Sequence, residues 1–249
     1  GVDSSLVAAL AVDAVGADRV HGVSMPSRFS SDGSKDDAAQ LAANMGIDYR
    51  EVAIMPAHDV LLAMLAPSFG ELAPDTTEEN LQSRIRGVLL MALSNKFGWL
   101  VLTTGNKSEA AVGYSTLYGD TAGGFAVIKD CPKLLVYDLC LWRNAQTDDL
   151  WIPEVSITKA PSAELRPDQR DDQSLPDYEV LDPLLEAYVE QDRTADELIA
   201  DGYDEVMVRR ITRLVDLAEY KRRQSPPGPL VSSKAFGIDR RLPITNGYR

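Results

Sequence analysis

The first residues of the chain have the composition of a phosphate-binding turn. Gly1, Asp3 and Ser4 stand at the start of residues 2–15, whose apolar side chains recur at helical spacing up to Gly16. The N-terminus of a helix offers unpaired N–H groups and the positive end of the helix dipole, and small residues let a phosphate group approach them. An ordinary N-cap is the alternative, and it is the commoner meaning of such a stretch.

A second polar stretch, residues 103–109, follows a predicted buried strand at residues 99–104. Ligands of open α/β sheets bind at the carboxyl ends of the strands, so polar residues are well placed there. Thr104 can donate to an adenine or a phosphate, and Glu109 can bind a divalent cation. A glycine-containing turn with a solvated carboxylate remains the alternative.

A glycine-rich segment occupies residues 113–124. Many glycines in a long non-periodic segment are typical of backbone packed closely on a ligand, although a flexible surface loop has the same composition. Lys133 then begins a predicted helix, where a cation opposes the helix dipole unless an anion lies near it. The position of Lys133 therefore favours a phosphate contact.

These candidate residues need a scaffold, and the sequence predicts an α/β one. Short β-rich runs alternate with helical segments, the pattern of βαβ units around a parallel sheet. Strands are predicted at residues 19–25, 47–54 and 99–104, and helices at 2–15, between Ser34 as N-cap and Gly46, and at 76–97, 133–144, 183–191, 195–200 and 204–222. Residues 156–178 are predicted to be loop. We also expect a strand ahead of residue 2, because a doubly wound sheet places one before its phosphate-binding helix.

Composition limits the class of function. The 249 residues carry a formal charge of −13, and so acidic a surface repels a phosphate backbone, so we expect no nucleic-acid binding. No apolar run reaches the roughly 18 residues that cross a bilayer. Cys131 and Cys140 form no Cys-x-x-Cys motif and favour buried, reduced thiols in a cytoplasmic protein. His21 and His58 are too far apart in sequence to suggest a histidine metal site.

The motifs together resemble the NAD synthetases, a family of N-type ATP pyrophosphatases whose pyrophosphate loop reads Ser-Gly-Gly-x-Asp-Ser. Of that loop this chain has the last glycine and the residues after it. The resemblance continues along the whole chain, in Met25-Pro-Ser-Arg-Phe-Ser-Ser31, Glu78-Glu-Asn-Leu-Gln-Ser-Arg-Ile-Arg-Gly87, Leu90-Met-Ala-Leu-Ser-Asn95, Thr103-Thr-Gly-Asn-Lys-Ser-Glu109, Tyr118-Gly-Asp120, Pro161-Ser-Ala-Glu-Leu-Arg-Pro167, Tyr220-Lys-Arg-Arg-Gln224 and Pro243-Ile-Thr-Asn246.

The resemblance implies a fold and a function. It implies a Rossmann-like parallel sheet flanked by helices, of the adenine nucleotide alpha hydrolase type, with a helical C-terminal part in a domain of residues 1–224 and an irregular tail at 225–249. The implied reaction is amidation of deamido-NAD to NAD through an acyl-adenylate. It uses ATP as a substrate and Mg²⁺ as a cofactor, and it releases AMP and pyrophosphate. The tail motif at residues 232–237 resembles the glutamine-dependent enzymes, so we expect a glutaminase domain ahead of this chain to supply ammonia, and a homo-oligomer.

The resemblance also implies roles for individual residues. The pyrophosphate loop comprises Gly1, Val2, Asp3 and Ser4, further ATP contacts are Thr104, Lys133 and Ser162, and Asp3 and Glu109 hold the metal. Deamido-NAD contacts are Asn80, Arg84, Glu109 and Lys221. Asp120 and Glu109 are the implied catalytic carboxylates, with Asp120 placed to orient or deprotonate ammonia. An ion pair with Glu79 remains the alternative for Arg84, and a solvated helix end remains the alternative for Lys221.

Other functions stay open at this point. An ammonia-dependent NAD synthetase needs no glutaminase, and GMP synthetase or a tRNA-modifying enzyme shares the ATP pyrophosphatase loop. The acidic charge argues against tRNA, and the motifs at 103–109 and 118–120 argue against both of these enzymes. A nucleotide-binding module without turnover is the remaining alternative.

Overall fold

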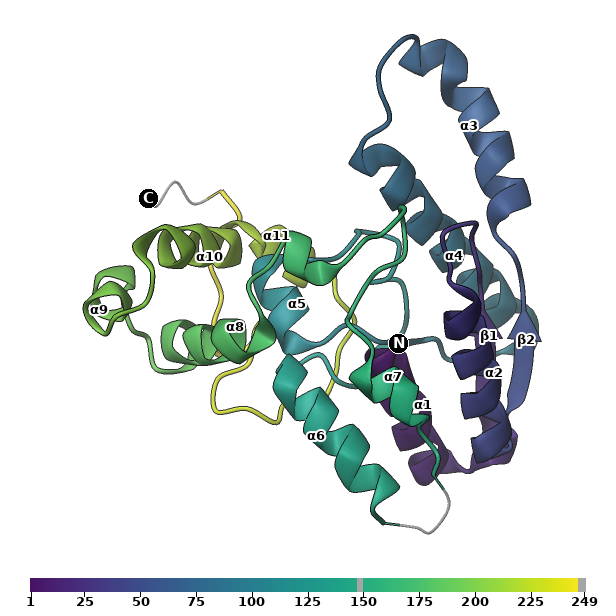
Figure 1. Cartoon of the computed structure of the whole chain (residues 1–249), viewed down its shortest axis with the longest axis horizontal. Helices are drawn as coiled ribbons and strands as arrows, with labels where there is room; N and C mark the ends of the chain where they lie inside the picture. The colour runs from purple at the N-terminus through teal and green to yellow at the C-terminus, as the bar shows by residue number, and fades with distance from the viewer. Residues whose placement is uncertain (147–149, 246–249) are drawn as a thin grey trace.

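Helix α1 (Val2–Val15) forms where the sequence predicts it and ends at Gly16. The computed structural model, which describes residues 1–146 and 150–245, packs this helix against α2 (Asp32–Met45) and α6 (Lys133–Asn144). Its buried side chains include Leu6 and Ala9, which are fully enclosed. Figure 1 shows the start of α1 near the centre of the molecule, where segments from both halves of the chain meet.

The strands are short and parallel. Strand β1 (His21–Ser24) pairs with β2 (Asp48–Glu51), and β3 (Leu102–Thr103) pairs with β4 (Phe125–Ala126). Within the described residues these are two separate two-stranded sheets, and helices flank them (Figure 1). The prediction of a parallel α/β fold flanked by helices is confirmed. A strand ahead of residue 2 stays a prediction.

Several predicted helices have the predicted bounds. These are α4 (Thr76–Phe97), α6, and α9 (Ala195–Ala200), whose Thr194 and Glu197 form a capping box. The remaining elements are η1 (Ala17–Arg19), α3 (Met55–Phe69), α5 (Lys107–Val112), α7 (Glu154–Thr158), η2 (Asp171–Gln173), α8 (Tyr178–Leu185), η3 (Glu186–Glu190), α10 (Glu205–Leu217) and α11 (Glu219–Arg222).

Two boundaries differ from the prediction for local reasons. Ser31, not Ser34, is the N-cap of α2, because its side chain accepts the N–H of Ser34 at 3.2 Å. Residues 99–101 do not belong to a strand. Gly98 is left-handed and ends α4, and the N–H of Trp99 donates to Ser94 O, so this backbone completes the helix end.

Other differences come from tertiary packing. The segment predicted as loop, 156–178, includes most of α7 and all of η2. Helix α8 begins at Tyr178, well before Pro183, because burial of Leu181 and Leu184 outweighs the missing N–H of that proline. The predicted helix 204–222 divides at Ala218 into α10 and α11. Residues 225–245 are irregular as predicted, whereas Asn246 of the tail motif lies outside the described residues.

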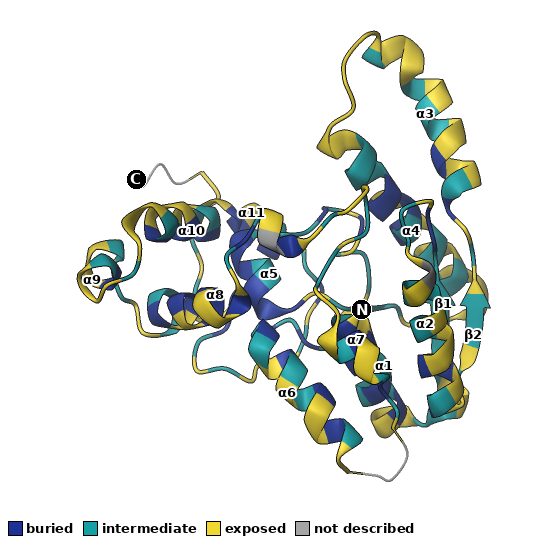
Figure 2. Ribbon diagram, viewed as in Figure 1, coloured by how far each residue is buried: buried dark blue, intermediate teal, exposed yellow. Residues whose placement is uncertain are grey.

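Two apolar cores hold the fold together. One surrounds α1 and α6 and contains both cysteines, which are free and buried as predicted. The other lies among α5, α8, α9 and α10, and Phe236 of the tail packs into it. Helix α3 belongs to neither core, and Figure 2 shows it largely exposed. Among residues 1–146 and 150–245, every helix is too short or too polar to cross a bilayer.

Candidate functional site

Two predicted ATP contacts and a predicted metal ligand meet at one point. The Lys133 ammonium forms an ion pair with Asp3 and lies 3.5 Å from Glu109 Oε1. Asp3 comes from the first turn of α1, Glu109 from α5 and Lys133 from the first position of α6. Three helix starts therefore converge on one buried charge cluster, which we call the Lys133 cluster.

The Lys133 cluster holds two carboxyl groups but only one ammonium. Burial, reinforced by the Asp3 carboxylate and partly offset by Lys133, raises the pKa of Glu109 to about 8. For Lys133 itself, burial opposes the charged form, but Glu109 and Asp3 outweigh burial and raise the pKa of the ammonium. Asp171 adds a further negative charge, and burial raises its pKa as well. Such a cluster favours an additional cation.

The donor set fits magnesium in part. Mg²⁺ in nucleotide sites is usually held by one or two carboxylates together with phosphate oxygens and water. Asp3 and Glu109 each keep 19% of their side-chain surface accessible, so both carboxylates can be reached by a ligand. Within the described residues no group of three acidic, histidine or cysteine side chains forms a complete metal site by itself. The residues present therefore suit a cation that arrives with phosphate.

The predicted pyrophosphate loop lies at the edge of this cluster. Gly1 is exposed, and its carbonyl accepts the Ser4 hydroxyl at 2.9 Å and the Ser5 hydroxyl at 3.0 Å. The side chain of Val2 is buried in the α1 core, so only its backbone can face a ligand. Thr104 directly follows β3 and is half-buried.

Ser162 lies in a polar loop that returns to the start of α2. Its hydroxyl donates to Gln169 O at 2.5 Å and accepts the Glu164 N–H at 3.1 Å. The same Glu164 carboxylate accepts from Lys159 at 3.1 Å and from Ser31 at 3.0 Å. This loop follows α7, which packs against α1.

A separate group of predicted residues gathers between α4 and the loop 113–124. Asn80 Oδ1 accepts the Thr116 hydroxyl at 2.7 Å, and Arg84 Nε donates to Leu117 O at 3.2 Å. Arg84 does not pair with Glu79, whose carboxylate lies 3.3 Å from Arg166. The glycine at position 87 permits this packing, because a Cβ there would lie 2.8 Å from Tyr118 O.

Asp120 and Lys221 complete this second group. Asp120 Oδ1 accepts the Thr116 N–H at 2.7 Å and the Ser83 hydroxyl at 3.0 Å. Asp120 as a whole residue is exposed, but desolvation of its carboxyl group raises its pKa, although these hydrogen bonds and Lys221 oppose the shift. Lys221 Nζ donates to Gly113 O at 2.7 Å and Ser115 O at 2.6 Å, so it holds the same loop and is not a solvated helix end.

Three residues in these surroundings were missed by sequence reasoning. Asn106 caps α5 and donates to Asp3 Oδ1 at 2.9 Å. Lys159 joins the Ser162 loop to α2. Arg86 is half-buried and donates to Met25 O at 3.0 Å. All three lie in or beside the motifs at residues 25–31, 78–87, 103–109 and 161–167, so the motifs themselves were the available signal.

Comparisons with known proteins identify the family of the chain. The NAD synthase family model matches residues 1–225. The chain belongs to the NAD synthase family. A glutamine-dependent NAD(+) synthetase of Acinetobacter baylyi is 53% identical over the whole chain, which covers 46% of that protein. The chain spans about half the length of the curated relatives that it matches.

Solved structures of the family share the fold. A glutamine-dependent NAD+ synthetase from Acinetobacter baumannii in complex with ADP is 48% identical, with a TM-score of 0.64 over 100% of this chain and 45% of that one. An NH3-dependent NAD synthetase from Campylobacter jejuni is 26% identical, with a TM-score of 0.69 over 89% of this chain and 82% of that one. The family is thus shown both by sequence and by fold.

Proposed function

We propose that this chain is the synthetase part of a glutamine-dependent NAD synthetase and converts deamido-NAD to NAD at the expense of ATP. The observation that carries the proposal is the convergence of Asp3, Glu109 and Lys133, because it unites a helix N-terminus, a cation and two accessible carboxylates at one point. Relatives about 50% identical over the full chain are glutamine-dependent NAD(+) synthetases, which supports the choice within the family.

The first half of the reaction joins substrate to nucleotide. A carboxylate oxygen of the nicotinate ring attacks the α-phosphorus of ATP, and the bond to pyrophosphate breaks. The N-terminal N–H groups of α1 and the Lys133 ammonium would stabilise the phosphates, while Lys159 and Ser162 follow α7, which packs against α1. The protein then contributes mainly by positioning the reactants and neutralising their charge.

Magnesium fits this step through its donor set. Asp3 and Glu109 would hold the ion, which when bound would neutralise phosphate charge and favour departure of pyrophosphate. With a cation bound, Lys133 would no longer be needed as the main counter-charge of the two carboxylates. Its ammonium would then be free to donate to phosphate.

The second half of the reaction needs neutral ammonia. Its nitrogen attacks the acyl carbon of the adenylate, loses one proton, and AMP leaves. Asp120 is proposed to take that proton or to orient the ammonia, because its raised pKa favours proton uptake over an ordinary aspartate. Asn80, Arg84 and Lys221 surround the same loop and would bind deamido-NAD there.

A product assay tests the proposal directly. Given deamido-NAD, Mg-ATP and ammonium, the protein should form NAD, AMP and pyrophosphate in equal amounts. ADP and phosphate as products would contradict the adenylate mechanism. Turnover with XMP, the substrate of GMP synthetases, in place of deamido-NAD would favour that rival enzyme.

Two further parts of the proposal concern partners. The relatives are about twice as long as this chain, which supports a glutaminase domain as the source of ammonia. An ammonia-dependent enzyme is the alternative, and a requirement for free ammonium even in the full-length protein would favour it.

Oligomerisation is supported by α3, where Val60 and Met64 expose apolar side chains, and sedimentation would measure it.

A further inference from the structure

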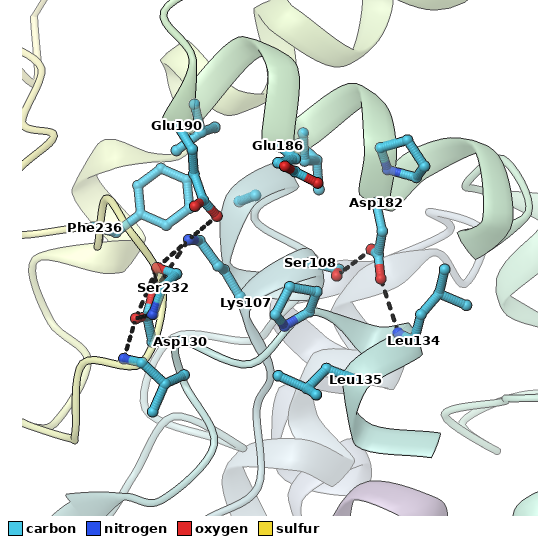
Figure 3. A pocket seen from close by; sticks show the side chains of 16 residues that line it. Lys107, Ser108, Asp130, Leu134, Leu135, Asp182, Glu186, Glu190, Ser232 and Phe236 are labelled. Carbon is cyan, nitrogen blue, oxygen red and sulfur yellow. Dashed lines mark hydrogen bonds and ion pairs between the residues drawn. The ribbon is translucent and has the colours of Figure 1, made fainter. Parts of the chain in front are cut away.

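Three consecutive buried residues at the start of α5 contact three different parts of the molecule. Asn106 donates to Asp3 of the Lys133 cluster at 2.9 Å. Ser108 donates to Asp182 of α8 and accepts the backbone N–H of Lys133 at 2.9 Å. Lys107, between them, extends toward the C-terminal tail along a cavity of about 350 Å³ that Ser108 and Asp182 also line (Figure 3).

The Lys107 ammonium is enclosed by oxygen acceptors. It lies 2.7 Å from Glu190 Oε1 and 3.3 Å from Asp130 Oδ1, and it donates to Ser232 Oγ at 2.6 Å and to Lys234 O at 3.0 Å. Its side chain is only 7% exposed. We call Lys107, Asp130, Glu190 and Ser232 the Lys107 clamp, and Figure 3 shows all four side chains meeting.

The clamp fastens the tail at several points. Asp130 accepts the N–H groups of Val231 and Ser232, both at 2.8 Å. The tail begins its contact earlier, where Pro227 O accepts the N–H of Ala126 in β4 at 2.8 Å. Only glycine fits at position 228, because a Cβ there would lie 2.1 Å from Ala126 O.

The π-helical turn η3 supplies the opposite wall of the clamp. Glu190, its last residue, accepts the Ser233 hydroxyl at 2.5 Å and N–H at 3.2 Å while it also binds Lys107. Single turns of π-helix are rare and frequently lie at functional sites. The tail is therefore hydrogen-bonded to both α5 and η3.

We propose that Lys107 is a positioning residue for adenylate formation, which holds the start of α5 in register so that Asn106 and Glu109 present the correct geometry to Asp3 and Lys133. The proposal rests on the proposed function for its catalytic consequence. Asn106 and Glu109 flank Lys107 within α5 and its N-cap, so a shift of Lys107 toward or away from the tail moves both. The tail thereby acts on a site that it does not touch.

The surroundings of the two clamp carboxylates hold both in their charged form. Burial alone would raise the pKa of Asp130, but the N–H groups and hydroxyl of the tail, with Lys107, hold it below its ordinary value. Burial is likewise outweighed at Glu190, whose pKa is lowered by Lys107 and Ser233. Both carboxylates therefore remain charged and paired.

The test compares two variants of the same protein, one with a change in η3 and one with a change in the tail. Glu190→Gln should weaken the clamp while it keeps the size of the side chain, and Lys234→Met should serve as control because Lys234 pairs with Asp192 at the surface. Deamido-NAD-dependent exchange between ATP and pyrophosphate reports adenylate formation. In Glu190→Gln, kcat for exchange should fall about tenfold with KM for ATP within about twofold, as expected for a small misplacement of catalytic groups. Lys234→Met should match wild type.

Hydrogen exchange provides an independent measurement. Residues 104–112 should exchange faster in Glu190→Gln than in Lys234→Met or wild type. A lower melting temperature with unchanged kcat and unchanged exchange at residues 104–112 would overturn the proposal, because the clamp would then be structural only. Ser232→Ala, which keeps both backbone bonds to Asp130, decides the question if Glu190→Gln does not fold. If wild type shows no exchange between ATP and pyrophosphate, the proposed function fails, and hydrogen exchange still decides whether the tail holds α5.

Discussion

Two buried lysines, Lys133 and Lys107, stand at the first positions of neighbouring helices, and each lies between two carboxylates. Lys133 faces Asp3 and Glu109, whose side chains are each 19% exposed. Lys107 faces carboxylates that are less exposed, at 4% and 13%, and it has two further oxygen acceptors. An ammonium has three N–H donors, so the acceptors around Lys107 leave no donor for a ligand.

The difference shows why the same residue types serve two purposes. Lys133 has one close partner, one at 3.5 Å, and the faces of Tyr137 and Tyr178 within 6 Å, so its hydrogen bonding can change when an anion arrives. Lys107 is saturated by parts of the chain that are far apart in sequence. A cluster with incomplete hydrogen bonding can bind a ligand, whereas a complete one joins segments.

The largest expected effect separates the two lysines. Lys133→Met should reduce exchange between ATP and pyrophosphate by roughly a thousandfold, the size expected when a group that stabilises transition-state charge is lost. Its effect on the melting temperature should be smaller than that of Lys107→Met, because the two carboxylates left behind can reach water. Lys107→Met should lower the free energy of unfolding by about 3–5 kcal/mol, the usual result of breaking a buried ion pair from one side.

Calorimetry and exchange kinetics on both variants measure this pair of effects. The comparison would be broken by the reverse result, in which Lys133→Met destabilises the protein more than Lys107→Met and keeps adenylate formation. Both lysines would then be structural.

The second group of residues gives an intermediate effect. Asp120→Asn should lower the rate of NAD formation with ammonium by about a hundredfold, since general acid–base groups contribute that much, while exchange between ATP and pyrophosphate changes less. The physical reason is that Asp120 binds to Ser83 and Thr116 and not to the Lys133 cluster. Measuring adenylate formation and NAD formation in one preparation checks that Asp120 acts in the second half-reaction only. An equal loss in both would place Asp120 in adenylate formation.

The sequence predicts the Lys133 cluster better than the Lys107 clamp, for a physical reason. Asp3 and Lys133 stand at the starts of predicted helices, and Glu109 belongs to a family motif that follows a predicted strand, so periodicity and motifs indicate all three. The α4, α6 and α9 bounds were predicted for the same reason. Local signals decide local structure.

The clamp depends on contacts between distant segments. Lys107 reaches Glu190, 83 residues away, and Ser232, 125 residues away. Its partner Glu190 stands in a π-helical turn that periodicity does not indicate, and the tail was predicted only as irregular. The start of α8 before Pro183 and the apolar but exposed α3 were missed likewise, because packing decides them.

The smallest expected effect concerns pH and the clamp. Asp130 and Glu190 both have lowered pKa values, so the unfolded chain takes up protons before the folded protein does. The stability that these carboxylates contribute is therefore complete above their ordinary pKa range and is lost as pH falls through their folded values. Lys107 is the cation that faces both. Between neutral pH and about pH 4, wild type should lose about 1 kcal/mol more stability than Glu190→Gln, whose amide does not titrate. Denaturant unfolding of both proteins across this range measures the difference.

Parallel pH profiles of the two proteins would contradict this prediction. They would mean that the ionised form of Glu190 is no more favoured in the folded protein than in the unfolded chain. The contrast between the two lysines would then rest on Asp130 alone.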